Sequence, residues 1–393
     1  MPRPVKSAVN GKGIYRPAHQ SHKLESSLPA YKYLTPQAGN IAGAWKTSGH
    51  FLDFQIPQRS VETLSSQMIR FNVVNAEAAA LTSPPSPHYV EAIEVRIGTE
   101  LVETIYPQDM FTETIGFKSL DELDSLNEVL KCGTDYVTSA QTIAIGASYV
   151  YLPFVCLLNA CKLYIKTLDD LVSFRVYFPN EFWGSKDVTL SDVTLILEEA
   201  KSNDAATQAD AHKSGITYGT IVRQHQTIQV ARALDDGEKQ IDLTGINGHS
   251  AGLIIYANTG AKKAYDGATS KINDIVRRLP VSEMTLLDQM GSKLTEKFQG
   301  DWLNSFVWLN QVGTPYPART HGNTYLMPFA ETFRYSVENG VHTGERKLTG
   351  NEKLLLGSYS GDAATWSLNV CNYRYVSLVF FDNKFVRIVR NFD

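Results

Sequence analysis

Histidine and cysteine are the side chains most able to support nucleophilic or metal-dependent chemistry, and both are scattered along this chain. The nine histidines form no H-E-x-x-H motif and no other close metal-ligand cluster, and the four cysteines form no C-x-x-C pair. We interpret the cysteines as small buried apolar residues, with a disulfide or a metal site as the alternative. The histidines are His19, His22, His50, His88, His212, His225, His249, His321 and His342, and the cysteines are Cys132, Cys156, Cys161 and Cys371.

Paired carboxylates are a second source of chemistry, because they can act as an acid and a base or bind calcium. Adjacent residues on a strand point to opposite faces, so we interpret the acidic doublets of this chain as solvated turn residues. These are Asp121-Glu122, Asp169-Asp170 and Asp235-Asp236, and the basic doublets Lys262-Lys263 and Arg277-Arg278 are either solvated or in subunit contacts.

Motifs for nucleophilic catalysis and for phosphate binding lack their usual context in this sequence. A G-x-S-x-G match occurs once, GHSAG at 248–252, but it leads into the strand predicted at 252–257 and not into the helix of a nucleophile elbow, and no P-loop pattern occurs. The glycine-containing segments 11–13 and 357–361 are short and lack the flanking strand and helix of a phosphate-binding loop. We therefore predict no enzymatic activity, with no catalytic, no cofactor-binding and no metal-binding residue, and no cofactor.

The elements that carry these residues are mostly short β-strands. Residues 50–56 and 68–74 alternate apolar and polar side chains, which predicts strands with one face in the core. Residues 89–106 predict two strands joined at a corner formed by Gly98 and Thr99. Further strands are predicted at 141–154, 161–167, 171–178, 188–198, 216–233, 239–243, 252–257, 272–287, 324–333, 353–358, 365–370, 373–381 and 385–389.

Two segments have the apolar spacing of amphipathic helices. One covers residues 118–131, with Ser119 as a suitable N-cap, and the other covers residues 292–309. A similar segment follows each of them, YLPF at 151–154 and YLMPF at 325–329, and the two lie 174 positions apart (325 − 151). Each half thus contains strands, a short helical insertion and more strands, which suggests a duplicated domain.

The composition excludes several classes of protein. The chain has 393 residues, of which 43% are hydrophobic and 20% charged, and its formal net charge is −4. A protein that condenses nucleic acid along its whole length would be strongly basic. No apolar run approaches the roughly 18 residues of a membrane-spanning helix, and the first residues lack the hydrophobic stretch of a secretory signal. We therefore expect a product made inside the cell.

Changes of composition along the chain predict four parts. Residues 1–48 form an extended basic arm, because seven positive charges and one negative charge give +6 within its first 46 residues, and prolines interrupt any helix. Residues 49–198 and 215–393 form two β-domains, joined by a polar linker at 199–214 that can contribute little to a core. The arm is either a solvated tail or a segment that contacts neighbouring subunits or an anionic surface of lipid or genome.

Many short strands with turn signals between them predict an all-β fold. Domains of about 160–180 residues, each with roughly eight strands and one helical excursion, suit the jelly roll. We therefore predict two tandem eight-stranded jelly rolls, each with a short helical insertion.

Segments from both halves resemble those of one known family in their residue patterns and in their order along the chain. They are FQIP at 54–57, IRFNV at 69–73, VEAIEVRIG at 90–98, the stretch 151–178, KQIDL at 239–243, SAGLIIYAN at 250–258 and the closing stretch 371–389. In these segments the chain resembles the double jelly-roll major capsid proteins of tailless icosahedral viruses, a lineage that includes the nucleocytoplasmic large DNA viruses and the adenovirus hexon. It departs from the family at Thr99, where a second glycine is usual, and in lacking the long tower insertions of hexon-type members.

The resemblance implies a structural protein of the virion that is synthesised inside the host cell. Three copies would form a homotrimer whose six jelly rolls give a pseudo-hexagonal capsomer, and such capsomers would tile an icosahedral shell. Its partners would be neighbouring capsomers, penton or minor capsid proteins, and an internal membrane or the genome through the N-terminal arm.

Two other functions remain open from the residues alone. A β-sandwich that binds carbohydrate for host attachment would leave the basic arm and the duplicated helical insertions unexplained. A tandem jelly-roll glycoprotein amidase needs a convergent acid and base, and the sequence names no such pair.

Overall fold

The computed structural model describes residues 30–39, 50–82, 85–117, 142–179, 183, 186–201, 205–230, 238–258, 280–300, 302–312, 324–357 and 366–390. The predicted helix at 118–131 lies outside the described residues, as do Cys132 and most of the predicted arm. Within the described part, no helix is long and apolar enough to cross a membrane.

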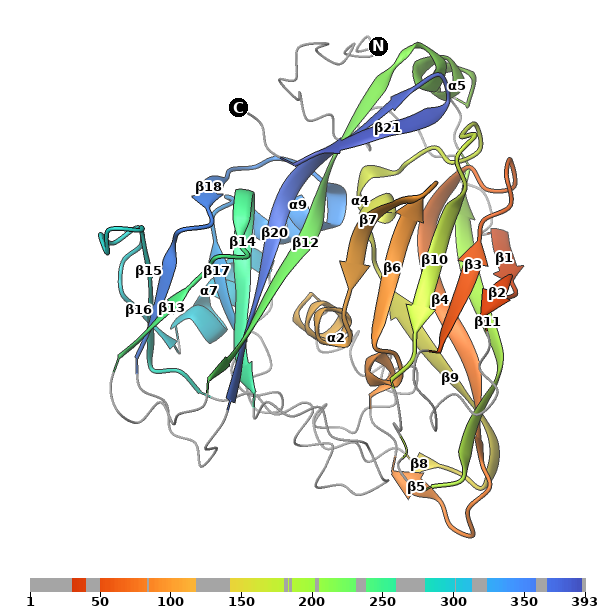
Figure 1. Cartoon of the computed structure of the whole chain (residues 1–393), viewed down its shortest axis with the longest axis horizontal. Helices are drawn as coiled ribbons and strands as arrows, with labels where there is room; N and C mark the ends of the chain where they lie inside the picture. The colour runs from red at the N-terminus through yellow and green to blue at the C-terminus, as the bar shows by residue number, and fades with distance from the viewer. Residues whose placement is uncertain are drawn as a thin grey trace.

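The first half of the chain folds into two antiparallel sheets and one small ribbon. Its strands are β1 (Ala30–Leu34), β2 (Ala38–Gly39), β3 (Phe51–Gln55), β4 (Thr63–Asn75), β5 (Leu81–Thr82), β6 (Ala92–Ile97), β7 (Glu100–Ile105), β8 (Thr142–Ile143), β9 (Gly146–Phe154), β10 (Val172–Tyr177) and β11 (Val188–Ala200). One sheet has the order β1-β11-β4-β9, the other has the order β2-β3-β10-β6-β7, and β5 pairs with β8 (Figure 1).

Period-two burial explains why these segments are strands. Ile69, Phe71 and Val73 of β4 are fully buried, whereas the residues between them are only partly buried. The predicted corner after β6 is confirmed, because β6 pairs with β7 across Gly98. Gly98 has a φ of +60°, a left-handed conformation that glycine adopts without steric cost.

The second half repeats the two-sheet arrangement. Its strands are β12 (Ile216–Val230), β13 (Lys239–Asp242), β14 (Asn247–Asn258), β15 (Glu283–Leu287), β16 (Phe298–Gln299), β17 (Thr324–Pro328), β18 (Arg346–Thr349), β19 (Lys353–Leu356), β20 (Trp366–Phe381) and β21 (Lys384–Val389). One sheet has the order β12-β20-β14-β17, with β18 beside β14 and β21 beside β20, and the other has the order β13-β19-β15-β16. The predicted strands at 365–370 and 373–381 are one continuous strand, β20, which pairs with β12 along its length.

Short helices connect the strands. They are η1 (Ser86–Tyr89), α2 (Pro107–Gly116), α4 (Leu157–Cys161), α5 (Ala205–Ser214), the π-helical turn η3 (Trp302–Phe306), α7 (Val307–Val312) and α9 (Phe333–Asn339). Helix α5 lies within the stretch predicted to be a linker. The domain boundaries themselves stay a prediction.

Three local predictions were wrong. Residues 161–167 are the end of α4 and a loop rather than a strand, and Lys162 ends the helix in a left-handed conformation. The predicted helix at 292–309 is wrong over its first part, because residues 292–299 form bends and β16, and the helical elements η3 and α7 follow later. The predicted strand at 324–333 stops at Pro328, and Phe333 begins α9.

The described end of the predicted N-terminal arm lies on the first half. Strand β1 pairs with β11 from Ala30 to Leu34, and β2 pairs with β3. Lys32 also approaches Glu199 at 3.9 Å. This part of the arm is therefore an edge strand of the first half, extended as predicted but hydrogen-bonded to the sheet.

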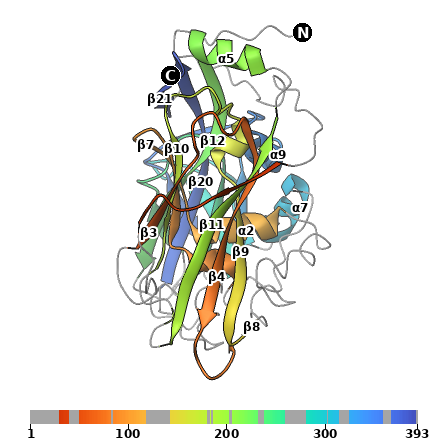
Figure 2. The ribbon, with the colours of Figure 1, turned by 90° about the vertical axis from the view of Figure 1, so that its right-hand side faces the viewer.

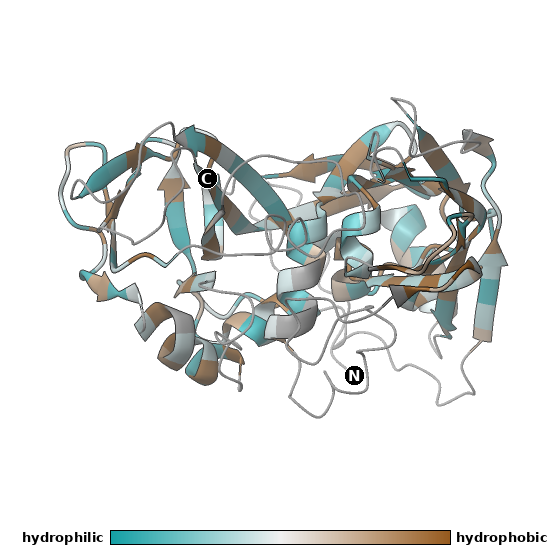
Figure 3. Cartoon of the chain, turned by 90° about the horizontal axis from the view of Figure 1, so that it is seen from below, coloured by the Kyte–Doolittle hydropathy of each residue, from teal (hydrophilic) through white to brown (hydrophobic). Residues whose placement is uncertain are grey.

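The two halves lie side by side, with helices between them. Figure 1 shows α2 and α4 on the side of the first half that faces β12 and β20, and α4 contacts both β12 and α9. Figure 2 shows β4, β9 and β11 upright, roughly along the direction of β12 and β20. Apolar and polar residues alternate along the strands of both halves, as Figure 3 shows. The faces that meet between the halves therefore come from helices of one half and the long strand pair of the other.

Candidate functional site

A buried ionic network joins the two halves. Arg223 of β12, whose side chain is 5% exposed, points toward the first half and contacts two carboxylates. Its Nη1 donates to Glu103 of β7 at 2.5 Å. Its Nε and Nη2 donate to the two oxygens of Glu113 of α2, both at 2.6 Å, which is the bidentate geometry that arginine forms with carboxylates.

Two further hydrogen bonds complete the network. The hydroxyl of Tyr373 on β20 donates to Glu113 at 2.6 Å, and the amide of Leu157 at the start of α4 donates to Glu103 at 2.8 Å. Every charged group of the network therefore has a partner, as burial of charge requires.

Secondary-structure periods place these side chains together. Asp109 and Glu113 lie four residues apart on α2 and so share one face of the helix. Across the strand pair, Arg223 lies opposite Tyr373, and His225 lies opposite Cys371. The result is two layers, one with Glu113, Arg223 and Tyr373 and one with Asp109, His225 and Cys371.

The start of α2 fixes the second layer. Pro107 occupies the first turn, where a missing N–H is tolerated, and Asp109 accepts the backbone N–H of Tyr106 at 3.0 Å. The same oxygen lies 2.6 Å from Nε2 of His225, and the ring of Tyr106 meets the imidazole edge-on at 4.8 Å between centroids.

The charged groups of the network shift one another's pKa values. Burial alone would lower the pKa of Arg223, but Glu113 and Glu103 more than offset it and hold that pKa above its usual value. Burial raises the pKa of Glu103, and Arg223 only partly opposes this. Burial would also raise the pKa of Asp109, but His225 and then Arg223 hold it below its usual value. The three carboxylates thus depend on one guanidinium and one imidazole.

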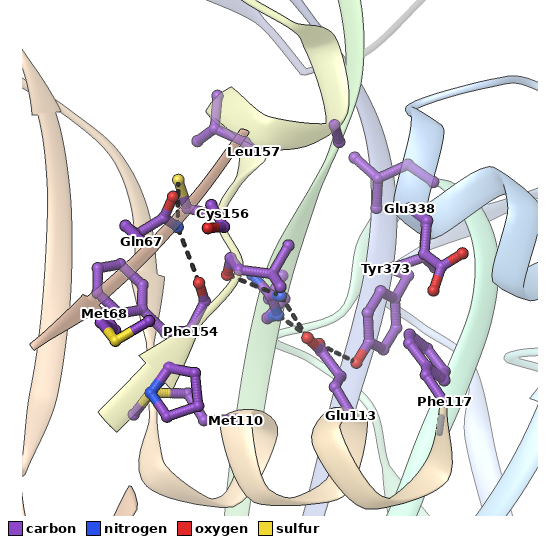
Figure 4. Close-up of a pocket in the computed structure, with 17 residues that line it drawn as sticks. Gln67, Met68, Met110, Glu113, Phe117, Phe154, Cys156, Leu157, Glu338 and Tyr373 are labelled. Carbon is purple, nitrogen blue, oxygen red and sulfur yellow. Dashed lines mark hydrogen bonds and ion pairs between the residues drawn. The ribbon is translucent and has the colours of Figure 1, made fainter. Parts of the chain in front are cut away.

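A cavity of about 310 Å³ lies beside the network (Figure 4). Both halves line it, and Figure 4 shows Glu113 reaching from α2 toward Tyr373, with Met68 and Met110 to one side of Glu113 and Phe117 to the other. On its polar wall, Glu113 accepts hydrogen bonds from Arg223 and from Tyr373.

The chain is similar to known proteins in its fold, whereas its sequence alone matches none of them. No protein-family model and no curated protein sequence matches the chain. Solved structures do match over nearly the whole chain. The VP54 protein of the virus PBCV-1 matches with a TM-score of 0.72 and 13% identity, and the match covers 95% of this chain and 98% of that one.

Two further structures agree with this match. The Faustovirus major capsid protein matches with a TM-score of 0.61 at 7% identity, covering 92% of each chain. The mavirus major capsid protein matches with a TM-score of 0.50 at 10% identity, covering 100% of this chain and 97% of that one. The fold is the double jelly roll of viral major capsid proteins. The predicted fold class is therefore confirmed.

In the double jelly roll, the ionic network lies between the first roll and the second. Its charged groups are satisfied by protein partners, and each comes from an element packed against the other roll. An arrangement of this kind fixes the angle and spacing of the two rolls, because rotation of one roll would separate Arg223 from both of its carboxylates.

The candidate residues named from the sequence have varied surroundings. The described cysteines, Cys156, Cys161 and Cys371, are free and buried, as predicted. Asp170 is not simply a solvated turn residue, because it accepts the backbone N–H of Phe385 on the second roll at 2.6 Å. The doublets Asp121-Glu122, Asp235-Asp236, Lys262-Lys263 and Arg277-Arg278 lie outside the described residues, as do His19, His22 and His321.

The linker contributes more to the core than its composition predicted. His212 of α5 is fully buried and contacts Thr167 at 2.9 Å and Tyr218 at 2.8 Å. Its ring also stacks on Phe380, with 5.4 Å between centroids. The prediction failed because a histidine with two hydrogen-bond partners can be buried, even in a segment without large apolar residues.

Sequence reasoning missed the network itself. Glu103, Glu113 and Arg223 are ordinary residues of a strand or helix in isolation, and their contacts depend on how the rolls dock. The one available signal was weak: Arg223 and His225 share a face of a long strand, so a buried neighbour would need to supply opposite charge.

A histidine pair in the second roll predicts a change of stability with pH. Glu345 lies 2.6 Å from Nδ1 of His249 and 2.7 Å from Nε2 of His342. Burial alone would raise the pKa of Glu345, but hydrogen bonds with these two histidines lower it. A lowered carboxyl pKa adds stability above the unfolded value of about 4.3 and loses it as the pH falls through the folded pKa.

We therefore expect Glu345→Gln to lower the melting temperature at about pH 6, and we expect this deficit to shrink as the pH falls below about 4.3, because the stability that the charge of Glu345 contributes is lost in that direction. Thermal unfolding of both proteins across this range checks the prediction. Glu331→Gln is the control, because Glu331 is exposed on the same roll. A deficit of the Glu345→Gln variant that stays constant with pH would contradict the role of its charge.

Proposed function

We propose that this chain is a structural major capsid protein without enzymatic activity. Three copies form a homotrimeric, pseudo-hexagonal capsomer, and such capsomers tile an icosahedral shell. The observation that carries the proposal is the double jelly-roll fold of viral major capsid proteins, which extends over at least 92% of this chain in the matched structures. Two rolls held at a fixed spacing give each subunit two of the six corners of a hexagon.

A threefold ring needs two different contact surfaces on each subunit. Trp302, Phe306 and Leu309 follow one another along η3 and α7 at helical spacing, and all three are exposed on the second roll. Tyr31 and Tyr33 are exposed on β1, the edge strand of the first roll. In our proposal the exposed helix face of one copy meets the β1 edge of the next copy. Repeated three times, this head-to-tail contact closes the ring.

The mass in solution tests this proposal first. One subunit is 43.7 kDa, so a trimer is expected at 131 kDa (3 × 43.7) by light scattering after size exclusion. The double variant Trp302→Glu and Phe306→Glu is expected to shift the population toward monomer, because two charges would be buried at the contact.

The control is Met290→Glu, which changes a residue that is 84% exposed in a turn of the same roll. This variant is expected to remain trimeric. A wild-type chain that is monomeric at micromolar concentration would contradict the capsomer and would favour a carbohydrate-binding protein or an amidase. A trimer that tolerates both glutamates would keep the capsomer and contradict the proposed contact.

The remaining parts of the proposal concern location and partners. The mature protein is part of the virion after synthesis in the host cell, and its partners are neighbouring capsomers and penton or minor capsid proteins. Residues 1–48 act as the inward arm toward an internal membrane or the genome, since they carry the excess of positive charge. The two rolls correspond to residues 49–198 and 215–393, joined by the linker at 199–214.

A further inference from the structure

Three side chains with metal-binding atoms meet between the two rolls. They are Asp109 of α2, His225 of β12 and Cys371 of β20, and their ligand atoms all lie within 4.8 Å of one another. His225 and Cys371 are direct cross-strand neighbours, so the sheet fixes their separation. Asp109 comes from the other roll and is held by the backbone N–H of Tyr106. The three ligands thus come from three different elements, two of them paired strands of one roll and the third a helix of the other.

Hydrogen bonds do not fully satisfy the polar atoms of this group. Nε2 of His225 is buried and lies 2.6 Å from Asp109, but the oxygen lies off the direction needed for an aligned hydrogen bond. Cys371 is a free thiol and is 2% exposed. A buried imidazole nitrogen without an aligned acceptor, next to a buried thiol and a carboxylate, is an arrangement that a cation would complete.

The buried acids also leave room for a cation. Glu103, Asp109 and Glu113 are all buried, and the guanidinium of Arg223 forms its ion pairs with Glu103 and Glu113. A divalent ion beside Asp109 would place positive charge next to this group of buried carboxylates.

We propose that Asp109, His225 and Cys371 bind one zinc-type divalent metal ion that links the two rolls. Oxygen, nitrogen and sulfur ligands together favour Zn²⁺ over Ca²⁺ or Mg²⁺, which prefer oxygen alone. Zinc bonds of about 2.0–2.3 Å place tetrahedral ligand atoms roughly 3.3–3.8 Å apart, so small rotations of these side chains suffice. This proposal departs from the sequence prediction of no metal-binding residue, because the three ligands lie far apart along the chain.

Water has a route to the fourth position of the metal. A cavity of about 330 Å³ adjoins the group and is lined by His225, Tyr106 and polar side chains that include Gln224 and Arg374. A site with three protein ligands and one water is a common zinc arrangement. In this position the ion would tie the first turn of α2 to the β12–β20 pair.

The test uses the full-length protein and the metal itself. Wild-type protein is loaded with Zn²⁺ and dialysed against metal-free buffer, and metal content is measured by mass spectrometry. We expect about one equivalent of zinc per chain. Loading with Co²⁺ is expected to produce a thiolate-to-cobalt charge-transfer band, together with visible bands typical of tetrahedral cobalt.

Variants assign the ligands. Cys371→Ser is expected to abolish the charge-transfer band, and His225→Gln and Asp109→Asn are expected to reduce the retained metal at least tenfold. Cys161→Ser is the matched control, because Cys161 is an equally buried free cysteine outside this group. It should keep both the band and the metal.

The wild-type measurement decides the proposal even if a variant fails to fold. Absence of retained zinc together with absence of a cobalt band in wild-type protein would overturn it. So would a charge-transfer band that survives in folded Cys371→Ser or disappears in Cys161→Ser. The oligomeric state does not enter either measurement, so the result is independent of the capsomer proposal.

Discussion

Replacing Arg223 with methionine should lower the free energy of unfolding by about 3–5 kcal/mol. The substitution leaves Glu103 and Glu113 buried without their shared cation, while the apolar volume at the site is nearly kept. Denaturation by urea at neutral pH measures the loss. Arg334→Met is the control: Arg334 pairs with Glu338 on α9 at 2.9 Å and donates to the carbonyl of Val312 at 3.2 Å, so its loss should cost only about 1–2 kcal/mol.

A triple variant separates the charge from the packing. Adding Glu103→Gln and Glu113→Gln to Arg223→Met removes both unpaired charges and keeps oxygens that can accept from Leu157 and Tyr373. We expect the triple variant to be more stable than Arg223→Met alone. Equal losses for the two proteins would mean that packing of the arginine stem, and not its charge, holds the rolls together.

Trp308→Ala should be comparably destabilising, by about 3–5 kcal/mol. Trp308 of α7 is fully buried, its indole N–H donates to the carbonyl of Thr324 at 3.0 Å, and its ring packs near Phe117 of the first roll at 6.3 Å. Truncation therefore leaves a cavity and removes the indole hydrogen bond to Thr324 at the same place. The loss is read from urea denaturation as for Arg223.

The control for Trp308→Ala is Met290→Ala, an exposed position that should change stability by less than about 0.5 kcal/mol. Equal effects at the two positions would contradict the packing of Trp308 at the roll interface. A smaller loss at Trp308 without loss of fold would indicate that neighbouring side chains move into the vacated space.

Strands with one face in the core could be predicted from the sequence, whereas short helices could not. The alternation around Phe71 and the corner at Gly98 are local signals, and both were interpreted correctly. Leu294 and Phe298 have helical spacing, yet Leu294 donates its N–H to Leu286 in an extended region, so tertiary pairing overrode the apolar period. Helix α9 was missed because seven residues give too few turns for a visible pattern.

The candidate sites required the docking of the two rolls. Asp109 and Glu113 share a helix face, and His225 and Cys371 are cross-strand neighbours, but only the fold brings the helix to the strands. No spacing along the sequence encodes that approach, because each residue type is common in its own element. Prediction from residues alone therefore gave the architecture and left the ionic network and the metal-ligand group unseen.

The hydrogen bond between Tyr373 and Glu113 joins residues 260 positions apart, and this has a consequence for the order of folding. Contacts between such distant residues form late, since a long loop must close before they are made, and large chains fold domain by domain. Each roll should therefore fold first, with Glu103 and Glu113 still hydrated, and dock second. Until docking, a subunit has no fixed spacing between its rolls, so in the capsomer that we propose the three subunits would close into a ring only after the network has formed.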